Sequence, residues 1–332
     1  MFSRISLLSL LYPYLLTINA CFIVFWIFVR PRNLIIPLLA IIIRVDYVPR
    51  FVNISTTDYK TSNDIKVLSY NVCDFSNKVY NNDSELIKEN QDSILAYIRS
   101  TNADIVCLQD YSGSQKDTNG FHYKMMNSLG YKHFFTYPND SSSIRNTAIY
   151  SKYHINNADC FFKEDTDYYE FIYADIRTPK KLIRVYNVHL VSYMLGPEEK
   201  ARYSKIKQGD IKMDTGSKKI VNKLVVANKK RNAQIEKIMP FISNTSLPYL
   251  IVGDFNDNPF SYTYSFMTKN LGDSFVAKGK KVGRTYNGVF PAYRIDYLLY
   301  QKKYFVIHDY QSPALNYSDH YPICITLSTK SL

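Results

Sequence analysis

Several sequence motifs that are typical of particular enzyme classes are absent from this sequence. Glycine is also scarce, with 11 copies in 332 residues. There is no glycine-rich phosphate loop, no dinucleotide-binding fingerprint and no GxSxG elbow. These absences remove the usual sequence signatures of P-loop NTPases, Rossmann-type enzymes and serine hydrolases of the α/β class. Any catalytic chemistry must therefore come from other side chains.

Cysteine is also used sparingly, without the spacing of a metal or disulfide site. The sequence contains no CxxC pair and no paired Cys and His motif, and the number of cysteines is odd. Three of them stand in or beside apolar runs, so we expect isolated buried thiols and leave the redox compartment open. The cysteines are Cys21, Cys73, Cys107, Cys160 and Cys324.

No Gly/Ser-rich, Pro-rich or repeated segment divides the chain. Hydrophobic residues make up 46% of the sequence and charged residues 21%, which is typical of a folded protein, and tyrosine is abundant with 30 copies. We expect one compact domain after the N-terminal segment.

The formal net charge is +12, so the surface attracts polyanions such as nucleic acid, anionic lipid headgroups and phosphorylated small molecules. Much of the excess lies in residues 200–231. A basic run of this kind is most often a solvated helix face, and a substrate-binding insertion is the alternative.

The first fifty residues differ in kind from the rest. From Ile5 to Val29 the chain carries no charge, and this length spans a hydrocarbon core. A shorter apolar run, NLIIPLLAIII, follows Arg30-Pro31-Arg32. We predict a membrane anchor over residues 1–54, as one span or a helical hairpin, and a linker over 55–64. A cleavable signal peptide is the alternative, but no small-residue cleavage site ends the run.

The topology of this anchor depends on the second apolar run. Arg30 and Arg32 outnumber Arg4 across the first span, which places the short loop between the runs in the cytoplasm. The domain then lies outside if the second run crosses the membrane and inside if it does not. We favour the extracytoplasmic side.

Beyond the anchor, short apolar runs typical of strands end in polar residues. The residues near these ends are Asn71, Asp110, Asn187, His189, Asp254 and Asn256. A later run, YRIDYLLY, carries Asp296, and the run SDHYPICITL opens with Asp319 and His320. Helical periodicity appears between the runs, over residues 84–100 and 232–242. Apolar strands that alternate with helices predict an α/β layered architecture, in which polar strand ends converge on one rim.

Each polar strand end also has a plain structural interpretation. A single Asn or Asp in this position is usually a turn or cap residue, and a single His in an apolar strand is usually a core side chain. The combined set favours a metal site. Oxygen and imidazole groups without cysteine suit a hard cation such as Mg²⁺, Mn²⁺ or Ca²⁺.

The blocks SYNV, IVCLQD, NTAIYSKYHI, VYNVHL, IVGDFNDNP, RIDYLLY and SDHYPI occur in this order. Together they resemble the signature blocks of the endonuclease/exonuclease/phosphatase superfamily, in its deoxyribonuclease/sphingomyelinase-like branch. The resemblance covers about residues 65–328, and we assign the catalytic domain to 65–332. It implies a four-layer α/β sandwich, with two central β-sheets flanked by helices and a divalent-metal site at one edge.

The resemblance also implies a role for each residue in hydrolysis of a phosphate ester by in-line water attack. The expected metal ligands are Asn71, Asp110 and Asp319. Catalytic roles fall to His189, Asp254, Asp296 and His320. Asn187 and Asn256 are expected to hold the phosphate. In this scheme Asp296 fixes the tautomer of His320, and His189 hydrogen-bonds a phosphoryl or leaving oxygen.

The chain departs from the family pattern at three positions. The family normally has Glu where this chain has Asp110, and the lost methylene withdraws the carboxylate by about 1.5 Å, a large change against metal–oxygen distances of roughly 2.1 Å. Asn146 replaces the usual Gly and His154 the usual Pro near the SKY block. The latter two concern packing more than chemistry.

The sequence leaves the substrate open. The leading hypothesis is a membrane-anchored, Mg²⁺-dependent (or Mn²⁺- or Ca²⁺-dependent) phosphodiesterase with nucleic acid as its substrate. A lipid headgroup or inositol phosphate is the alternative substrate. A membrane-tethered pseudoenzyme that binds a phosphorylated partner is the alternative of another class, motivated by Asp110. A monomer is assumed by default.

Overall fold

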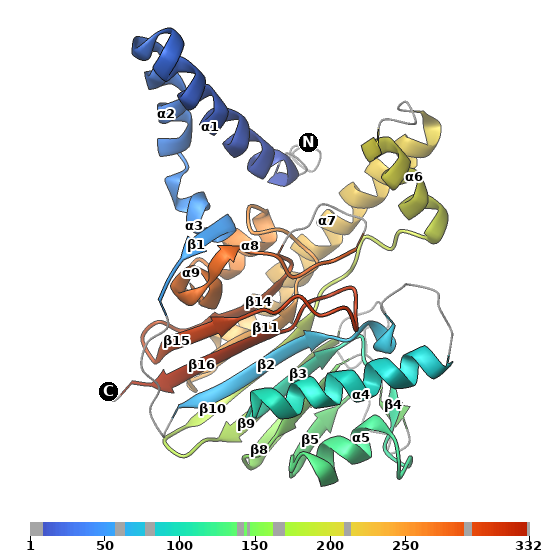
Figure 1. Cartoon of the computed structure of the whole chain (residues 1–332). Coiled ribbons are helices and arrows are strands. Elements are labelled where there is room, and N and C mark those ends of the chain that lie inside the picture. The colour runs from blue at the N-terminus through green and yellow to red at the C-terminus, as the bar shows by residue number, and fades with distance from the viewer. Residues whose placement is uncertain are drawn as a thin grey trace.

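The computed structural model describes residues 9–56, 64–76, 84–137, 143–144, 147–161, 170–208, 214–288 and 294–330. In this part of the chain, two six-stranded sheets lie face to face, with helices on their outer faces (Figure 1). The expected α/β fold with two central sheets flanked by helices is confirmed. Asn146 and Arg4, which entered the sequence analysis, lie outside the described residues.

One sheet is formed, in spatial order, by β15 (Phe305–Gln311), β16 (Ile323–Thr329), β2 (Ile65–Asn71), β3 (Ile105–Gln109), β7 (Ala148–Ser151) and β5 (His133–Thr136). Its central neighbours β2 and β3 run parallel, and its other pairs are antiparallel. Every residue of β3 is buried, as expected for an apolar strand that is covered on both faces.

The other sheet is formed by β12 (Gly272–Asp273), β14 (Asp296–Tyr300), β11 (Tyr249–Asp254), β10 (Leu182–His189), β9 (Glu170–Arg177) and β8 (Ile155–Cys160). It repeats the same plan, because β10 and β11 are parallel at the centre and the remaining pairs are antiparallel. Each sheet therefore has one central pair of strands whose carboxyl ends point the same way.

Three apolar clusters separate the layers. The largest fills the space between the sheets with residues from both, such as Val67 and Val185. The second lies beneath α4 (Ser84–Thr101) and α5 (Phe121–Tyr123), and the third beneath α7 (Thr215–Ser243) and α8 (Tyr262–Met267). Both predicted helical patterns are present, since residues 84–100 lie in α4 and residues 232–242 in the second half of α7.

The N-terminal segment forms a helical hairpin that projects from the domain (Figure 1). Helix α1 (Tyr12–Val29) is followed by a 3₁₀ turn at Pro31–Leu34 and by α2 (Ile35–Ile42). The Tyr12 hydroxyl donates to the Arg44 carbonyl at 3.2 Å, so both ends of the hairpin lie at the domain. Residues Ser9–Val29 are long and apolar enough to cross a membrane by length and composition, and few of them are buried.

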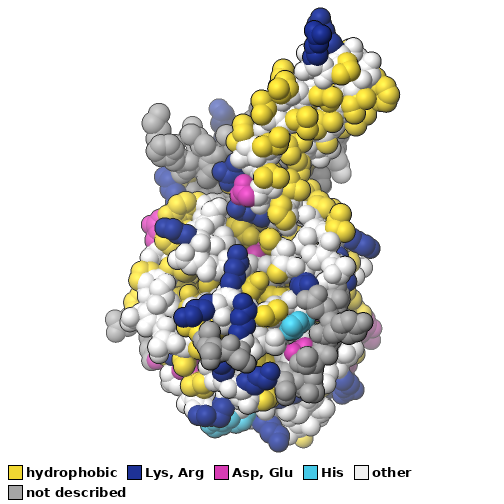
Figure 2. Space-filling model, turned by 90° about the vertical axis from the view of Figure 1, so that its left-hand side faces the viewer, with side chains coloured by type: hydrophobic (Ala, Val, Ile, Leu, Met, Phe, Trp, Pro, Cys, Tyr) yellow, Lys and Arg dark blue, Asp and Glu magenta, His cyan; other side chains and the backbone are white. Residues whose placement is uncertain are grey.

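The hairpin leads into the domain through α3 (Val48–Phe51) and β1 (Val52–Ile54). Strand β1 pairs with β13 (Lys280–Val282), which follows α9 (Ser274–Lys278). A second small ribbon pairs β4 (Gly113–Ser114) with β6 (Ser143–Ile144). The hydrophobic side chains of the hairpin form a projecting surface with basic residues at its far end (Figure 2), where the chain turns at Arg30–Arg32.

The basic segment contains α6 (Pro197–Gln208) and the first half of α7. The Asp214 carboxylate accepts the Ser217 N–H at 3.0 Å and caps α7. Arg231 does not belong to a solvated face, because it is fully buried. Its guanidinium donates to the Val191 carbonyl and lies 3.5 Å from the Asp257 carboxylate.

The cysteines are all free thiols. Cys107, Cys160 and Cys324 are buried as expected, whereas Cys73 is half-buried and Cys21 is exposed on α1. None of the five lies in the group of side chains with metal-ligand geometry found among the described residues.

Candidate active site

The two sheets bring polar side chains from five strands or strand ends to one edge of the sandwich. The parallel register places His189 beside Asp254, and the antiparallel register places Asp296 beside Asp254 from the other side. In the facing sheet, Asn71 ends β2 and Asp110 follows β3. The convergence expected from the strand ends is therefore present in the structure.

Gly253 explains how β11 delivers its last residue to this edge. Its φ is +135°, and a Cβ atom at this position would lie 2.0 Å from the Val188 carbonyl oxygen of β10. Only glycine fits this close approach of two backbones. The glycine in the GDFN block is thus a packing requirement that sets the position of Asp254.

Asp254 lies at the centre of the site and contacts three of its other side chains. Its side chain is only 1% exposed, and its Oδ2 accepts a hydrogen bond from Asn71 Nδ2 at 2.9 Å. The same oxygen lies 3.7 Å from Nε2 of His189 and 3.7 Å from Nε2 of His320. Two imidazoles therefore flank one buried carboxylate.

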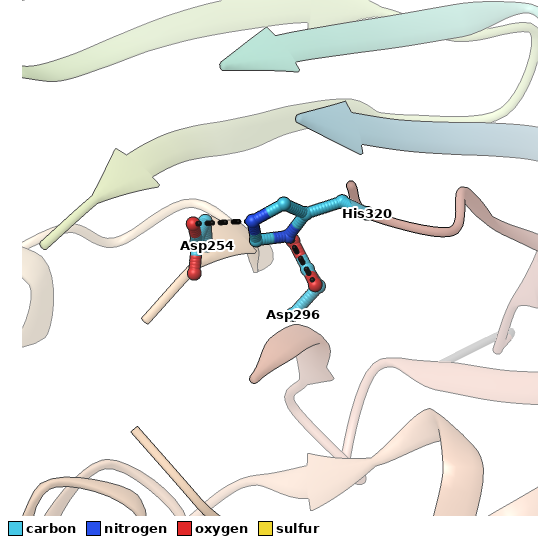
Figure 3. Close-up of side chains that lie close together, drawn as sticks. All are labelled: Asp254, Asp296 and His320. Atoms are coloured by element: carbon cyan, nitrogen blue, oxygen red, sulfur yellow. Dashed lines mark hydrogen bonds and ion pairs between the residues drawn. The ribbon is translucent and has the colours of Figure 1, made fainter. Parts of the chain in front are cut away.

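His320 lies between two carboxylates (Figure 3). Its Nδ1 is 2.9 Å from Asp296 Oδ2, and its Nε2 faces Asp254. The hydrogen bond to Asp296 fixes the orientation of the ring, as a carboxylate does for the histidine of hydrolase triads. The pairing that the sequence predicted for Asp296 and His320 is present.

His189 and Asp110 form the more open side of the site. Nδ1 of His189 lies 3.6 Å from Asp110 Oδ1, and Asn71 donates to Asp110 Oδ2 at 3.3 Å. The Asp110 side chain is 42% exposed, whereas those of Asp254 and Asp296 are nearly inaccessible. Solvent and ligands therefore meet the site from the side of Asp110.

The electrostatics of the site follow from burial and charge. Burial, with the nearby Asp296 charge, raises the pKa of Asp254 to about 6. Burial alone would lower the pKa of His320, but the carboxylates of Asp296 and Asp254 raise it well above its usual value. These charges favour a protonated imidazole at neutral pH, which can donate a hydrogen bond from Nε2.

Asp319 offers the clearest test of whether the site fits a cation. Its Oδ1 is buried, and no donor among the described residues hydrogen-bonds to it. His320 Nε2 lies 3.9 Å from this oxygen. An unsatisfied buried carboxylate oxygen is costly, and a bound cation would satisfy it. The predicted oxygen donors Asn71, Asp110 and Asp319 thus fit a hard divalent ion.

A second donor group overlaps this one. Asp254, Asp296 and His320 are buried and offer ligand atoms within 4.8 Å of one another, which is also consistent with a metal site. However, Asp296 already holds Nδ1 of His320 at hydrogen-bond distance. The predicted set of Asn71, Asp110 and Asp319 offers oxygen atoms alone, which is the ligand chemistry that Mg²⁺ prefers.

Asn187 is not brought into the site. It is fully buried between the sheets, where its Nδ2 donates to the Leu108 and Ala148 carbonyls and its Oδ1 accepts from Gln109 Nε2 at 2.7 Å. These bonds occupy the whole amide, so Asn187 joins the two sheets beneath the site.

Asn256 lies at the site with its amide already engaged. Its Nδ2 donates to the Leu190 carbonyl at 2.9 Å and to Asp254 Oδ2 at 3.2 Å, and its backbone N–H donates to Asp254 Oδ1 at 2.7 Å. Its φ of +51° is a left-handed conformation that asparagine tolerates. These contacts orient Asp254.

Sequence reasoning missed Tyr286. Its ring lies edge-on to His320 with centroids 5.2 Å apart, and its backbone bridges to His320. Burial and the charges of Asp319 and Asp254 raise its pKa, so it remains a neutral hydroxyl. Tyr286 belongs to no apolar run that ends in polar residues, which left nothing in the sequence to indicate it.

Smaller groups that support the site were missed as well. Ser318 Oγ donates to the Asn71 carbonyl at 2.8 Å, and Thr285 Oγ1 accepts the Asp296 N–H at 3.0 Å. Burial and the nearby charge of Asp319 raise the pKa of the Cys73 thiol, which therefore stays neutral beside the site. SDH in the sequence could have indicated Ser318, but isolated Thr and Cys residues give no such signal.

Several solved structures share this fold at low sequence identity. An endonuclease/exonuclease/phosphatase from Bacteroides vulgatus is 16% identical with a TM-score of 0.55, covering 82% of this chain and 100% of that chain. The human Nocturnin catalytic domain with bound sulfate is 16% identical with a TM-score of 0.53, covering 82% and 96%. An endonuclease/exonuclease/phosphatase from Beutenbergia cavernae is 14% identical with a TM-score of 0.54, covering 80% and 72%.

Two family models match the sequence, whereas no curated protein sequence does. Residues 1–51 match a domain of unknown function, DUF8431, so the N-terminal segment has a family of its own. Residues 68–320, which include every site residue described above, match the Endonuclease/Exonuclease/phosphatase family. The chain therefore belongs to the endonuclease/exonuclease/phosphatase family.

Proposed function

We propose that this protein is a membrane-anchored, divalent-metal-dependent phosphodiesterase. The observation that carries the proposal is the arrangement around Asp254, which has an imidazole on each side and an unsatisfied Asp319 oxygen nearby. Such a site offers proton donors and acceptors next to a place for a cation, which is what phosphate ester hydrolysis requires.

Asp254 is positioned to orient the attacking water and accept its proton. Asn71 and Asn256 hold the carboxylate from two sides, which leaves it little freedom to rotate. In the reaction, a bond forms between the water oxygen and phosphorus while the bond to the leaving oxygen breaks. The proton lost by water passes to Asp254, and the leaving oxygen takes its proton from another group of the site.

The two histidines serve the phosphoryl and leaving oxygens. His320, kept protonated by Asp296 and Asp254, donates from Nε2 to a phosphoryl oxygen and stabilises its growing negative charge. His189 lies on the open side, beside Asp110, where it can protonate the leaving oxygen. We assign Asn256 to orientation of Asp254, because its amide hydrogens face Asp254 and the Leu190 carbonyl.

Asn71, Asp110 and Asp319 would hold the metal ion, with Mg²⁺ the best match to these oxygen donors. When bound, such an ion neutralises negative charge on the phosphoryl group and polarises it toward attack. Asp110 reaches less far than glutamate, so its bond to the ion is the one we expect to be weak.

The hairpin is proposed as the membrane anchor. Its helix α1 rises about 27 Å at roughly 1.5 Å per residue, close to the thickness of a hydrocarbon core. Because both ends meet the domain, the turn at Arg30–Arg32 and the domain lie on opposite sides of the membrane. Arg30, Arg32 and Arg44 are all exposed, but Arg44 lies 3.7 Å from the Asp46 carboxylate and over the Tyr47 ring. We assign the turn to the cytoplasm and the domain to the extracytoplasmic side.

The substrate class we favour is a nucleic acid, because the net charge of +12 attracts a polyphosphate. A lipid headgroup or an inositol phosphate is the alternative. The full chain in nanodiscs is assayed with bis-p-nitrophenyl phosphate, plasmid DNA, RNA and phospholipid, each with Mg²⁺, Mn²⁺ or EDTA. We expect metal-dependent turnover that EDTA abolishes and that His320→Ala lowers by at least a hundredfold.

A pseudoenzyme would behave differently in this experiment. No metal-dependent turnover on any substrate, with His320→Ala indistinguishable from wild type, would overturn the hydrolase and favour binding without catalysis. Protease accessibility of the domain in intact cells tests the topology. Protection of the domain from external protease would contradict the extracytoplasmic assignment.

A further inference from the structure

The base of the hairpin contacts the loop that directly follows two site residues, Asp254 and Asn256. After β11 ends at Asp254, the chain continues through Asn256 to Phe260 before α8 begins. We call residues Asp257–Phe260 the DNPF loop. This loop is buried, with Asn258 2% and Phe260 6% exposed, and residues of the hairpin base provide much of the cover.

Phe260 sits in an aromatic socket formed by the base of the hairpin. The ring centroid of Tyr12, in the first turn of α1, lies 4.4 Å away. The rings of Tyr47 and Phe51, which follow α2, lie at 5.4 Å and 6.4 Å. Aromatic rings from the start and from the end of the hairpin therefore pack around Phe260. Ring contacts of this kind add stability beyond that of burial alone.

Polar contacts tie the same loop to the hairpin. Asn258 Nδ2 donates to Ser9 Oγ at 3.0 Å, at the start of the apolar span. Arg50 donates to the Pro259 carbonyl at 3.3 Å while its guanidinium lies over the Tyr47 ring at 4.3 Å. The loop is thus fixed from both ends of the hairpin.

Hydrogen bonds order the DNPF loop and also the turn from Asp254 to Asn256 that directly precedes it. The Phe260 N–H donates to Asn258 Oδ1 at 3.0 Å, and the Tyr297 hydroxyl donates to the Asp257 carbonyl at 2.8 Å. Two residues earlier, the Asn256 N–H donates to Asp254 Oδ1. A displacement of Phe260 is therefore transmitted along the four residues of the DNPF loop to Asn256, and so to the bonds between Asn256 and Asp254.

The base of the hairpin is itself held firmly on the domain. Fully buried Arg294 donates to the Arg50 carbonyl at 3.2 Å. Asn53 Nδ2 donates to the Phe275 and Val276 carbonyls, each at 2.8 Å, while β1 pairs with β13. Residues 48–54 are part of the packed domain rather than a tether, so the hairpin has a defined position on the loop.

We propose that the hairpin base is a positioning element of the active site as well as an anchor. In this role Tyr12, Tyr47 and Arg50 are positioning residues that act through Phe260 and Asn258 on Asn256 and Asp254. The proposal rests on the proposed hydrolase function for its kinetic consequences only. Its structural half, that the hairpin sets the order of the Asp254–Asn258 turn, can be measured without turnover.

The test compares full-length variants in nanodiscs. Phe260→Ala empties the socket and Tyr12→Ala removes one of its walls, and the double variant combines them. Tyr262→Ala is the matched control, since this exposed ring lies two residues further along and contacts Glu236 and Phe266 instead. Phe260→Leu and Tyr12→Phe keep the apolar volume or the ring, and they serve if the alanine variants fail to fold.

Two measurements are made on each variant: hydrogen exchange of peptides covering 254–258, and the division of any activity change between kcat and KM. We expect exchange of the Asn256 amide to quicken at least tenfold in Phe260→Ala and Tyr12→Ala. We expect kcat to fall roughly ten- to a hundredfold with KM nearly unchanged, because small misplacements of catalytic groups are costly. The double variant is expected to be no worse than the poorer single variant.

The outcomes separate this inference from the proposed function. Exchange at Asn256 that matches the Tyr262→Ala control, in folded variants, would overturn the positioning role even in an active enzyme. Strictly additive losses in the double variant would also overturn it. Faster hydrogen exchange at Asn256 in the alanine variants of a protein that hydrolyses no phosphate ester would support the positioning role and refute the proposed hydrolase function. Recovery in Phe260→Leu and Tyr12→Phe supports it further.

Discussion

The hydrogen bond between Asp296 and His320 offers the sharpest test of the catalytic arrangement. Asp296→Asn preserves the shape of a side chain that is 3% exposed, so packing should change little. It removes the negative charge that lies 2.9 Å and 3.1 Å from His320 Nδ1. The amide can also present an N–H to the ring, which would stabilise the wrong tautomer.

The expected loss follows from the strength of this bond. A hydrogen bond to a charged group contributes about 1.5 to 3 kcal/mol net. If the bond acts mainly in the transition state, roughly 1.4 kcal/mol for each factor of ten gives a fall in kcat of about ten- to 150-fold. KM should change little, because the charge on the phosphoryl oxygen that His320 stabilises grows only as the transition state forms.

The assay is saturation kinetics of bis-p-nitrophenyl phosphate with Mg²⁺, together with the urea midpoint of unfolding. Asp309→Asn is the control, because Asp309 is also a buried strand carboxylate, accepts from Gln311 Nε2 at 2.7 Å and lies on the edge strand β15. A change in kcat below twofold, or one equal to that of the control, would refute the assignment of Asp296 as the residue that orients His320.

Three further predictions follow from particular residues. Asp110→Glu should tighten Mg²⁺ binding measured by calorimetry, and unchanged affinity would mean that Asp110 is not a ligand. Arg294→Met leaves the buried carboxylate of Asp273, now 2.7 Å from the guanidinium, without its cationic partner. This variant should lose about 3 to 5 kcal/mol of unfolding free energy in urea titrations, and a loss below 1 kcal/mol would contradict the prediction. Neutralising four lysines should weaken DNA binding and flatten its salt dependence, whereas an unchanged slope would return them to a solvated helix face. These lysines are Lys218, Lys219, Lys229 and Lys230.

The fold was predictable because its central strands are apolar on both faces. Runs such as IVCLQ and YLIVGD leave no polar face to water, and they became fully buried strands between helical layers. The order of the blocks then placed the strand ends at one edge. Asn71, Asp110, His189, Asp254, Asp296, Asp319 and His320 meet there.

The roles of individual amides could not be read in the same way. Asn187 has the same sequence setting as Asn71, at the end of an apolar strand, yet its amide bridges the sheets. Asn187 and His189 lie two residues apart on β10 and therefore share one face of the strand. The depth along the strand places Asn187 between the sheets and His189 at their edge. The sequence pattern does not show which groups of the facing sheet an asparagine will contact, so it could not predict that Asn187 bonds the other sheet.

The sequence also contained no sign that one charged side chain in the basic run, that of Arg231, would be buried. Arg231 follows Lys229 and Lys230 in a basic run, but the helix turns it toward Asp257 and the Tyr193 ring, which lies 4.4 Å from its guanidinium. A basic run predicts that its side chains are exposed to solvent. The position of each residue around the helix decides which of these cations is buried instead. The same holds for Tyr286, which reaches the site from a loop without any periodic pattern.

The amide pair of Gln109 and Asn187 has a mechanical consequence for substrate selection. It fastens the centres of the two sheets to each other directly beneath the catalytic edge, through bonds of 2.7 Å, 2.9 Å and 3.0 Å. Shear of one sheet against the other would break these buried bonds, so the two halves of the edge cannot slide to suit ligands of different size. Adjustment to a substrate must then come from the segments that overhang the edge, such as the one bearing Tyr286.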